Sequence, residues 1–244
     1  MKENQSIFNF DKKLIKNNYD IIKNNIMKYD HKVTLLAATK TIPPDVINYA
    51  VNELGIRDIG ENRVQELLDK YDAIQMEASD DSANNLNIHF IGALQTNKVK
   101  YIVDKVSMIH SLDSYKLAEE IEKQAAKINR IIDVLIEVNI GEEPNKSGVL
   151  PDYDIIVKFV SSLEAFSHVN VRGMMTMAPI CQNNSEYVKY FKKTYKIFID
   201  IFNKKFHNID IPILSMGMSD SYIPAIECGS NMIRVGTALF GKRN

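Results

Sequence analysis

The sequence predicts an α/β protein that forms a single (β/α)8 TIM barrel over residues 1–244, with one extra N-terminal helix. Short apolar segments alternate with amphipathic segments eight times without a linker, which is typical of a parallel sheet with crossover helices. The length of 244 residues suits one such barrel. An open, doubly wound sheet is the alternative, but no GxGxxG or GxxxxGK[ST] motif follows a predicted strand.

The elements of the first half follow from apolar spacing and from residues that interrupt it. The first helix carries apolar residues at helical spacing, with Lys and Asn between them. Pro43 and Pro44 cannot join a strand ladder, so they end the first strand and open the next helix. A polar stretch at 76–87 indicates a surface loop. The predicted elements are helix 10–29, strand 33–40, helix 43–53, strand 56–59, helix 64–71, strand 88–92, helix 97–104 and strand 106–111.

The second half repeats the pattern. Ser114 is a candidate helix N-cap, and residues 139–148 form a loop rich in turn formers. The long helix 184–206 carries an aromatic stripe, which we interpret as core packing rather than as a cofactor site. The predicted elements are helix 114–129, strand 131–138, helix 152–166, strand 169–177, helix 184–206, strand 213–218, helix 220–228 and strand 232–236, followed by a final helical turn.

Composition limits the classes of partner. The net charge of −1, with 45% hydrophobic and 25% charged residues, is ordinary for a soluble globular protein and argues against nucleic acid or an anionic membrane as partner. Cys181 and Cys228 lie far apart and form no CxxC motif. With no apolar signal core and no membrane-spanning run, we expect a cytoplasmic protein. No long apolar stripe requires an oligomer, so we expect a monomer.

Lys40 ends the apolar run VTLLAATK at 33–40. Strand residues alternate faces, so Leu36, Ala38 and Lys40 are expected on one side. A lysine at the buried end of a strand would have a lowered pKa, which suits a Schiff-base nucleophile. The alternative is a lysine whose stem lies along the strand end while its ammonium stays in water.

The last two strands end in motifs that can bind phosphate. Ser219 follows the seventh strand, and Gly236 and Thr237 follow the eighth. A glycine permits close approach of the backbone, and the hydroxyl groups donate hydrogen bonds. In a (β/α)8 barrel a phosphate site is often built at these two strand ends. Two ordinary strand-to-helix caps are the alternative.

Two further polar residues lie at predicted strand ends. Arg234 within the eighth strand needs a partner, either in a structural ion pair or in a ligand, and Arg172 raises the same question. Asn62 is either a helix cap or a contact to a ligand. The five histidines show no metal-binding spacing, so we expect no metal site. The absence of GxSxG argues against a hydrolase.

Seven sequence blocks stand out in order along the chain. They are AATKT at 37–41, GENRVQE at 60–66, HFIGALQTNK at 89–98, VNIGEEPNKSG at 138–148, RGMMT at 172–176, SMGMS at 215–219 and GSNMIRVGTALFG at 229–241. Together they resemble the YggS/PROSC family of pyridoxal 5′-phosphate homeostasis proteins, and the resemblance covers nearly the whole chain. One departure is visible, because the family usually has Ser-x-Asp where this chain has Ser219-Asp220-Ser221; the displaced acid is expected to cap the next helix.

The resemblance implies a barrel like the N-terminal domain of alanine racemase. It also implies pyridoxal 5′-phosphate as cofactor, held as an internal aldimine on Lys40, with Asn62 beside it. Arg234 would face the pyridine nitrogen. Ser219, Gly236 and Thr237 would hold the phosphate. Lys146 matches a family lysine, and the roles of Lys146 and Lys98 stay open.

Reactivity distinguishes a carrier from an enzyme. An arginine beside the pyridine nitrogen only donates, which keeps that nitrogen unprotonated and weakens the cofactor as an electron sink. The chain ends soon after the eighth strand, so we expect no second domain to supply a second base. We therefore expect a protein without established catalytic activity that buffers or delivers the cofactor, with apo forms of pyridoxal-phosphate enzymes as partners. The alternatives are an amino-acid racemase or lyase of weak activity, and a phosphate-binding barrel enzyme without the cofactor.

Overall fold

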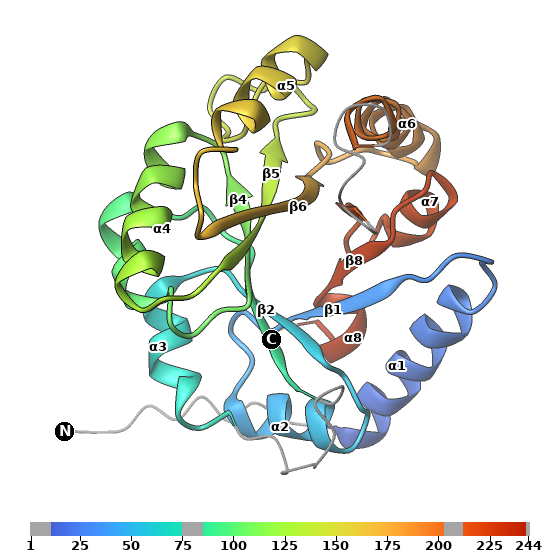
Figure 1. The fold of residues 1–244 in the computed structure, drawn as a ribbon. Coiled ribbons are helices and arrows are strands. Elements are labelled where there is room, and N and C mark those ends of the chain that lie inside the picture. Colours follow the sequence, from blue (N-terminus) through green and yellow to red (C-terminus); the bar gives the residue numbers. More distant parts are fainter. Residues whose placement is uncertain (1–10, 75–84, 203–211, 243–244) are drawn as a thin grey trace.

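The computed structural model describes residues 11–74, 85–202 and 212–242. Within these ranges eight parallel strands pair in sequence order, and β8 pairs back onto β1 to close a barrel (Figure 1). The predicted (β/α)8 class is therefore confirmed. The strands are β1 (Thr34–Ala38), β2 (Asp58–Glu61), β3 (Asn87–Phe90), β4 (Met108–Leu112), β5 (Ile132–Val138), β6 (Val169–Thr176), β7 (Ile213–Ser215) and β8 (Met232–Val235).

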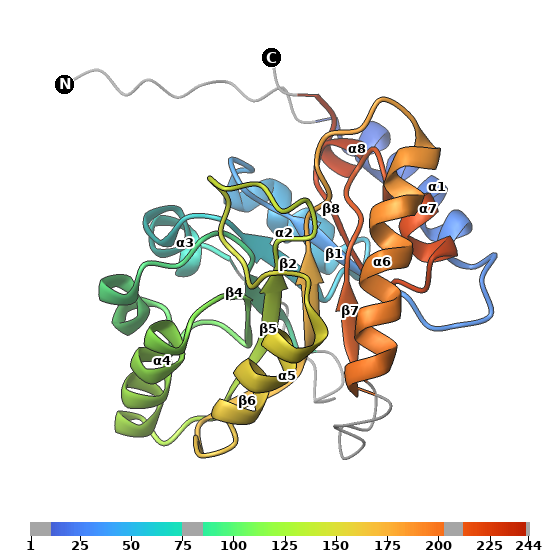
Figure 2. The same cartoon turned by 90° about the horizontal axis from the view of Figure 1, so that it is seen from above.

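Helices cover the outside of the barrel (Figures 1 and 2). They are α1 (Lys12–Ile26), α2 (Pro44–Asn52), α3 (Val64–Tyr71), the 3₁₀ helix η2 (Thr96–Tyr101), α4 (Tyr115–Lys127), α5 (Tyr153–Ser162), α6 (Asn184–Phe202), α7 (Tyr222–Glu227) and α8 (Thr237–Phe240). Phe10, residues 76–84 of the predicted loop and residues 203–206 of the predicted long helix lie outside the described ranges.

The extra N-terminal helix is α1. Its Ile15 and Ile22 are buried, and Asn18 Nδ2 donates to the Leu239 carbonyl of α8 at 3.0 Å. Asp11 caps α1 by accepting from the Leu14 N–H. The first and last helices of the described chain therefore pack side by side (Figure 2).

The core has two layers because strand residues alternate faces. Ala37, Ile233 and Val235 point outward into the large cluster between the strands and the helices. Leu36 and Ala38 point inward, where they pack with Ile91 and Met232. Most of the aromatic stripe of α6 packs into the outer layer as predicted, with Phe191, Phe198 and Phe202 buried, whereas Tyr195 is exposed.

Several predicted boundaries were wrong, and the second strand shows why. It was predicted at 56–59 but spans Asp58–Glu61. Gly60 pairs with Ala38 and lies inside the ladder. A Cβ at Gly60 would lie 2.6 Å from Leu36 Cδ2, so the position needs a glycine for packing rather than for a turn. The predicted helix at 97–104 is a 3₁₀ turn, and β1 and β7 end earlier than predicted, at Ala38 and Ser215.

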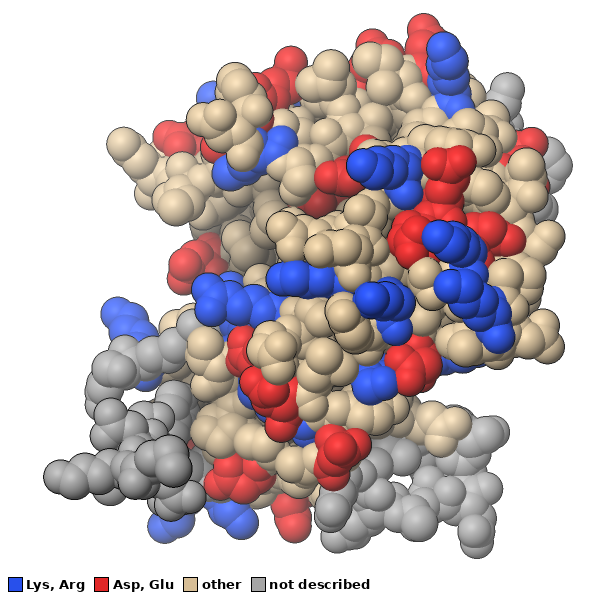
Figure 3. Space-filling model, turned by 90° about the vertical axis from the view of Figure 1, so that its left-hand side faces the viewer, with Lys and Arg blue, Asp and Glu red and all other residues tan. Residues whose placement is uncertain are grey.

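Charges of both signs share the surface. The face in Figure 3 carries Lys and Arg beside Asp and Glu, in keeping with the net charge of −1. Across the described ranges no helix combines the length and apolar character needed to span a membrane. Nor do those ranges hold a group of three or more His, Cys, Asp or Glu residues that could bind a metal ion.

Candidate functional site

A cavity of about 210 Å³ lies at the C-terminal ends of the barrel strands. In a (β/α)8 barrel this end carries the active or binding site. All six residues that the sequence singled out line this cavity, namely Lys40, Asn62, Ser219, Arg234, Gly236 and Thr237. Ala38, Ile91, Met177, Met218 and Asp220 complete the lining. The six predicted residues come from the ends of four strands, β1, β2, β7 and β8.

Lys40 lies at the rim of this cavity, in a turn two residues beyond the end of β1. The prediction that Lys40 lies at the buried end of the strand was wrong, because β1 ends at Ala38 and Lys40 is exposed. The ladder stops at Ala38, and Thr39 already turns back, with its carbonyl accepting from the Ile42 N–H at 2.9 Å. Thr41 has a φ of 62°, which is rare for a β-branched residue. The lysine is therefore presented from a constrained turn.

Asn62 follows β2 and does not cap α3, whose N-cap is Arg63. Its Oδ1 is buried and has no hydrogen-bond partner among the described residues. A buried polar atom without a partner costs about 1–3 kcal/mol. Because Asn62 lines the cavity, this amide oxygen is placed to accept from a group bound there.

Arg234 lies inside the barrel and is only 4% exposed. Its Nη1 donates to Ser215 O at 2.9 Å and Ser215 Oγ at 2.7 Å, and its Nη2 donates to Thr176 O at 2.9 Å. Burial lowers its pKa to about 10, partly offset by Glu137. The side chain is therefore charged at neutral pH. Its Nε makes no hydrogen bond within the described part of the chain.

A line of hydrogen bonds runs from Arg234 through the barrel. Ser215 Oγ lies 3.4 Å from His110 Nδ1, His110 Nε2 lies 2.9 Å from His89 Nδ1, and His89 Nε2 lies 3.0 Å from Asp58 Oδ1. One order of donors satisfies every link: Ser215 donates to His110, His110 to His89 and His89 to the Asp58 carboxylate. Burial, together with the neighbouring His89 and the positive charge of Arg234, lowers the pKa of His110 well below 6.5, which keeps its Nδ1 available as an acceptor.

Ser219, Gly236 and Thr237 lie where β7 and β8 end. Ser219 Oγ accepts from the Ala238 N–H of α8 at 3.0 Å, so its own O–H remains as a donor. The Thr237 hydroxyl is exposed and makes no hydrogen bond with the described residues. A Cβ at Gly236 would lie 3.2 Å from the Ala38 carbonyl oxygen, so a larger residue would press on β1.

The structure shows where Asp220 and Ser221 lie, the two residues at which this chain departs from the Ser-x-Asp pattern. The N-cap residue of α7 is Ser221, whose Oγ accepts from the Met218 N–H at 3.1 Å. Asp220, expected to cap this helix, is instead exposed and lines the cavity. The prediction about Asp220 was wrong, because the N-cap position of α7 is Ser221, which makes no side-chain bond to the helix.

Sequence reasoning missed a cluster of charged residues beneath Lys40. Lys70 of α3 is 9% exposed, and its Nζ donates to Glu61 Oε1 at 3.1 Å, to Glu66 Oε1 at 2.5 Å and to Thr39 O at 3.0 Å. Thr39 Oγ1 also donates to Glu61 Oε1 at 2.7 Å. We call Thr39, Glu61, Glu66 and Lys70 the Lys70 cluster. The available signal was a lysine on the apolar side of a short helix, three residues after buried Leu67.

The other predicted basic residues lie elsewhere. Arg172 pairs with Asp133 at 3.3 Å and remains partly exposed, so it is a structural arginine. Lys146 pairs with Glu143 at 2.6 Å and lines a neighbouring cavity of about 250 Å³, which also includes buried Glu137 and shares Met177 with the first cavity. Lys98 is exposed on η2.

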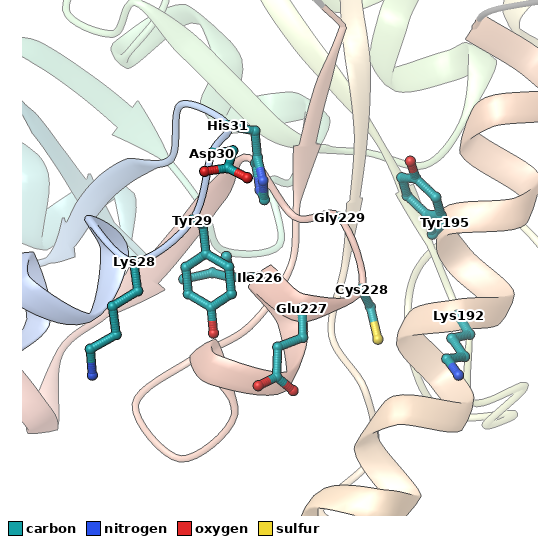
Figure 4. Close-up of a pocket in the computed structure, with 10 residues that line it drawn as sticks. All are labelled: Lys28, Tyr29, Asp30, His31, Lys192, Tyr195, Ile226, Glu227, Cys228 and Gly229. Atoms are coloured by element: carbon teal, nitrogen blue, oxygen red, sulfur yellow. The ribbon is translucent and has the colours of Figure 1, made fainter.

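A larger hollow, of about 660 Å³, shares no lining residue with the cavity of about 210 Å³. It is bordered by residues 28–31 before β1, by α6 and by residues 226–229, which cover the end of α7 and the turn after it (Figure 4). Its rim mixes Lys28 and Lys192 with Asp30 and Glu227, and all four are exposed. The smaller cavity is the candidate functional site, because a buried arginine and an unpartnered amide oxygen converge there among the described residues.

Comparisons with known proteins place the chain among its relatives. The family described as "Alanine racemase, N-terminal domain" matches residues 10–244. A pyridoxal phosphate homeostasis protein of Aquifex aeolicus is 46% identical over 209 residues, which is 86% of each chain. The protein of the same name in Escherichia coli K12 is 35% identical over 215 residues, or 87% of each chain.

Solved structures agree with this placement. PipY of Synechococcus elongatus PCC7942, solved without PLP, is 30% identical with a TM-score of 0.80, covering 93% of this chain and 100% of that one. The same protein has also been solved with PLP bound. An alanine racemase of Clostridium difficile 630 shares the fold at 17% identity and a TM-score of 0.68, covering 93% of this chain and 57% of that one. The chain belongs to the family of pyridoxal phosphate homeostasis proteins.

Proposed function

We propose that this protein binds pyridoxal 5′-phosphate at the mouth of its barrel and buffers or delivers it within the cell, without a catalytic turnover of its own. The observation that carries the proposal is the convergence of a lysine, a buried arginine and an unpartnered amide oxygen on one cavity. The family membership supports it, since the relatives are named for pyridoxal phosphate homeostasis.

The residues present fit the cofactor. Asn62 Oδ1 is buried without a partner, and an acceptor in that state calls for a donor in the cavity. The hydroxyls of Ser219 and Thr237 border the same space, beside Gly236 where the backbone comes close to β1. Lys40 provides a primary amine at the rim. When bound, the cofactor supplies an aldehyde that condenses with a primary amine with loss of one water.

Each residue then has a distinct task. Lys40 would hold the cofactor through its Nζ, and its exposed position would leave it open to exchange with another amine. Arg234, with its pKa of about 10, stays charged; it would donate to the ring nitrogen and supplies no carboxylate that would favour ring protonation. Asn62 would orient the ring edge. Ser219, Gly236 and Thr237 would hold the phosphate.

The phosphate assignment predicts a selective loss in one variant. Thr237→Val keeps the side-chain shape and removes an exposed hydroxyl that has no partner in the described chain, so the fold should be unaffected. Affinity for pyridoxal 5′-phosphate should fall by about tenfold to a hundredfold, since a hydrogen bond to a charged group contributes about 1.5–3 kcal/mol. Affinity for pyridoxal, which lacks the phosphate, should not change. Ser114→Ala is the control, and equal losses for both ligands would reject the assignment.

A transfer experiment tests the carrier role. The loaded protein is mixed with the apo form of a pyridoxal-phosphate enzyme, in the presence of a phosphatase that destroys free cofactor. We expect the recipient to regain activity and the donor to lose its bound cofactor. In parallel, an amino acid in deuterated water should show no α-proton exchange above that caused by free cofactor. Exchange well above that background would favour a racemase or lyase, and failure of the recipient to acquire cofactor would reject delivery.

A further inference from the structure

Both peptide groups that flank Lys40 are held by one helix. The carbonyl of Thr39 accepts from Lys70 Nζ at 3.0 Å, and the Thr41 N–H donates to Glu66 Oε1. Lys70 and Glu66 are themselves an ion pair one turn apart on α3. The backbone on each side of Lys40 is therefore tied to the same pair of side chains.

The turn that carries Lys40 needs such support. Thr41 has a φ of 62°, a conformation that a β-branched residue adopts only when its surroundings impose it. The charged acceptor on its N–H is Glu66, and charge-assisted hydrogen bonds are stronger than neutral ones. The strained turn and the charged group that holds it are thus in direct contact.

Every hydrogen-bond donor of the Lys70 ammonium in the Lys70 cluster has an acceptor. The three donors of the Lys70 ammonium match three acceptors, Thr39 O, Glu61 Oε1 and Glu66 Oε1. Glu61 is fully buried, and its neighbour in the chain is Asn62 of the cavity. Burying an ion pair costs desolvation free energy, and hydrophobic side chains of similar size could fill the same space. We therefore infer that the Lys70 cluster has a role beyond packing.

We propose that the Lys70 cluster is a positioning device that sets the direction of Lys40 by fixing the backbone on both sides of it. Glu66 is its key member, because it contacts Lys70 and the strained Thr41 together. This inference rests on the proposed function, in which Lys40 bonds the cofactor. The device governs how fast Lys40 captures an aldehyde, not how well the cavity holds the ring and phosphate.

The test uses substitutions at Glu66 because Lys70 then keeps its ion pair with Glu61, so we expect these variants to fold. Lys70→Met would leave the buried Glu61 carboxylate unpaired and could unfold the chain. Glu66→Gln retains an oxygen that accepts from Thr41, whereas Glu66→Met retains only the shape. Gln65→Met, one residue earlier on the exposed side of α3, is the matched control.

Three quantities are measured on the full chain. The first is the rate at which a borohydride-reducible bond forms between Lys40 and pyridoxal 5′-phosphate; it should fall about tenfold in Glu66→Met and stay within about twofold in Glu66→Gln and Gln65→Met. The second is the affinity for pyridoxine 5′-phosphate, which has no aldehyde and should bind all variants alike. The third is hydrogen exchange of the Thr41 amide without ligand, which should accelerate about tenfold or more only in Glu66→Met.

The outcomes separate the two proposals. A wild-type protein that forms no reducible bond would reject the proposed function itself. A normal wild type with an equally fast Glu66→Met variant would overturn the positioning role alone. Equal losses of capture rate and of pyridoxine 5′-phosphate affinity would overturn it too, because the cluster would then support the whole cavity. Unchanged exchange at Thr41 in Glu66→Met would show that Glu66 does not hold the turn.

Discussion

Lys40→Ala is expected to abolish the covalent retention of pyridoxal 5′-phosphate. Without the amine the cofactor would be held only by Asn62, Arg234 and the phosphate contacts, and affinity should fall by on the order of a hundredfold, which is about 2.7 kcal/mol. Lys40 is exposed, so the free energy of unfolding should change by less than about 0.5 kcal/mol. Gel filtration after loading, followed by cofactor assay, measures the retained fraction.

Lys28→Ala is the matched control for this prediction. Lys28 is another exposed lysine, and it borders the larger hollow shown in Figure 4. Its removal should leave retention at the wild-type level. If Lys40→Ala retained as much borohydride-reducible cofactor as the wild type, the anchor would lie elsewhere. If Lys28→Ala lost it instead, the binding site would belong to the larger hollow.

Arg234→Met should cause the largest loss of stability at the site. Three hydrogen bonds from the guanidinium disappear, which leaves Ser215 O and Thr176 O buried without their charged donor. We expect the free energy of unfolding to fall by about 3–5 kcal/mol. Urea unfolding without ligand measures this loss. Arg234→Lys keeps the charge and should lose less.

Arg172→Met is the control, because Arg172 is the other arginine on a barrel strand. It is partly exposed and pairs with Asp133 at 3.3 Å, so its removal should cost less than about 1 kcal/mol. Equal losses in the two variants would contradict the structural distinction between them. Arg234→Glu is a poorer probe, because its carboxylate would face the carbonyl oxygens of Ser215 and Thr176.

Cofactor binding to Arg234→Lys tests the second role of this residue. The ammonium lacks the planar set of donors that arginine presents, so the bond toward the ring nitrogen should be weakened. We expect a shifted absorption band of the bound cofactor together with normal retention on Lys40. An unchanged band would argue that Arg234 supports the barrel without contacting the ring.

Much of the fold was predictable because each strand is a short apolar run and each crossover is amphipathic. The alternation of Leu36 and Ala38 inward with Ala37 outward followed directly from strand geometry. The element boundaries were not predictable, since a glycine can either form a turn or lie inside a strand where there is no space for a side chain. Gly60 reads as a turn residue in the sequence, yet it lies within β2 because Leu36 fills the space beside it.

The site was predictable to the extent that strand ends identify it. Lys40, Arg234 and Thr237 follow from their places at or near the ends of β1 and β8, and the cavity unites them. The exposure of Lys40 could not be predicted from the sequence, because it depends on the chain leaving the strand ladder at Thr39. The Lys70 cluster could not be predicted either, since its bonds join residues from β2, α3 and the turn after β1 that only the folded chain brings together.

The most direct test of the account is borohydride reduction of the purified protein loaded with pyridoxal 5′-phosphate, followed by digestion and mass mapping of the peptides. The account predicts one pyridoxyl group per chain, attached to the peptide that contains Lys40. Attachment chiefly to Lys146, Lys98 or Lys28, or no attachment at all, would contradict it.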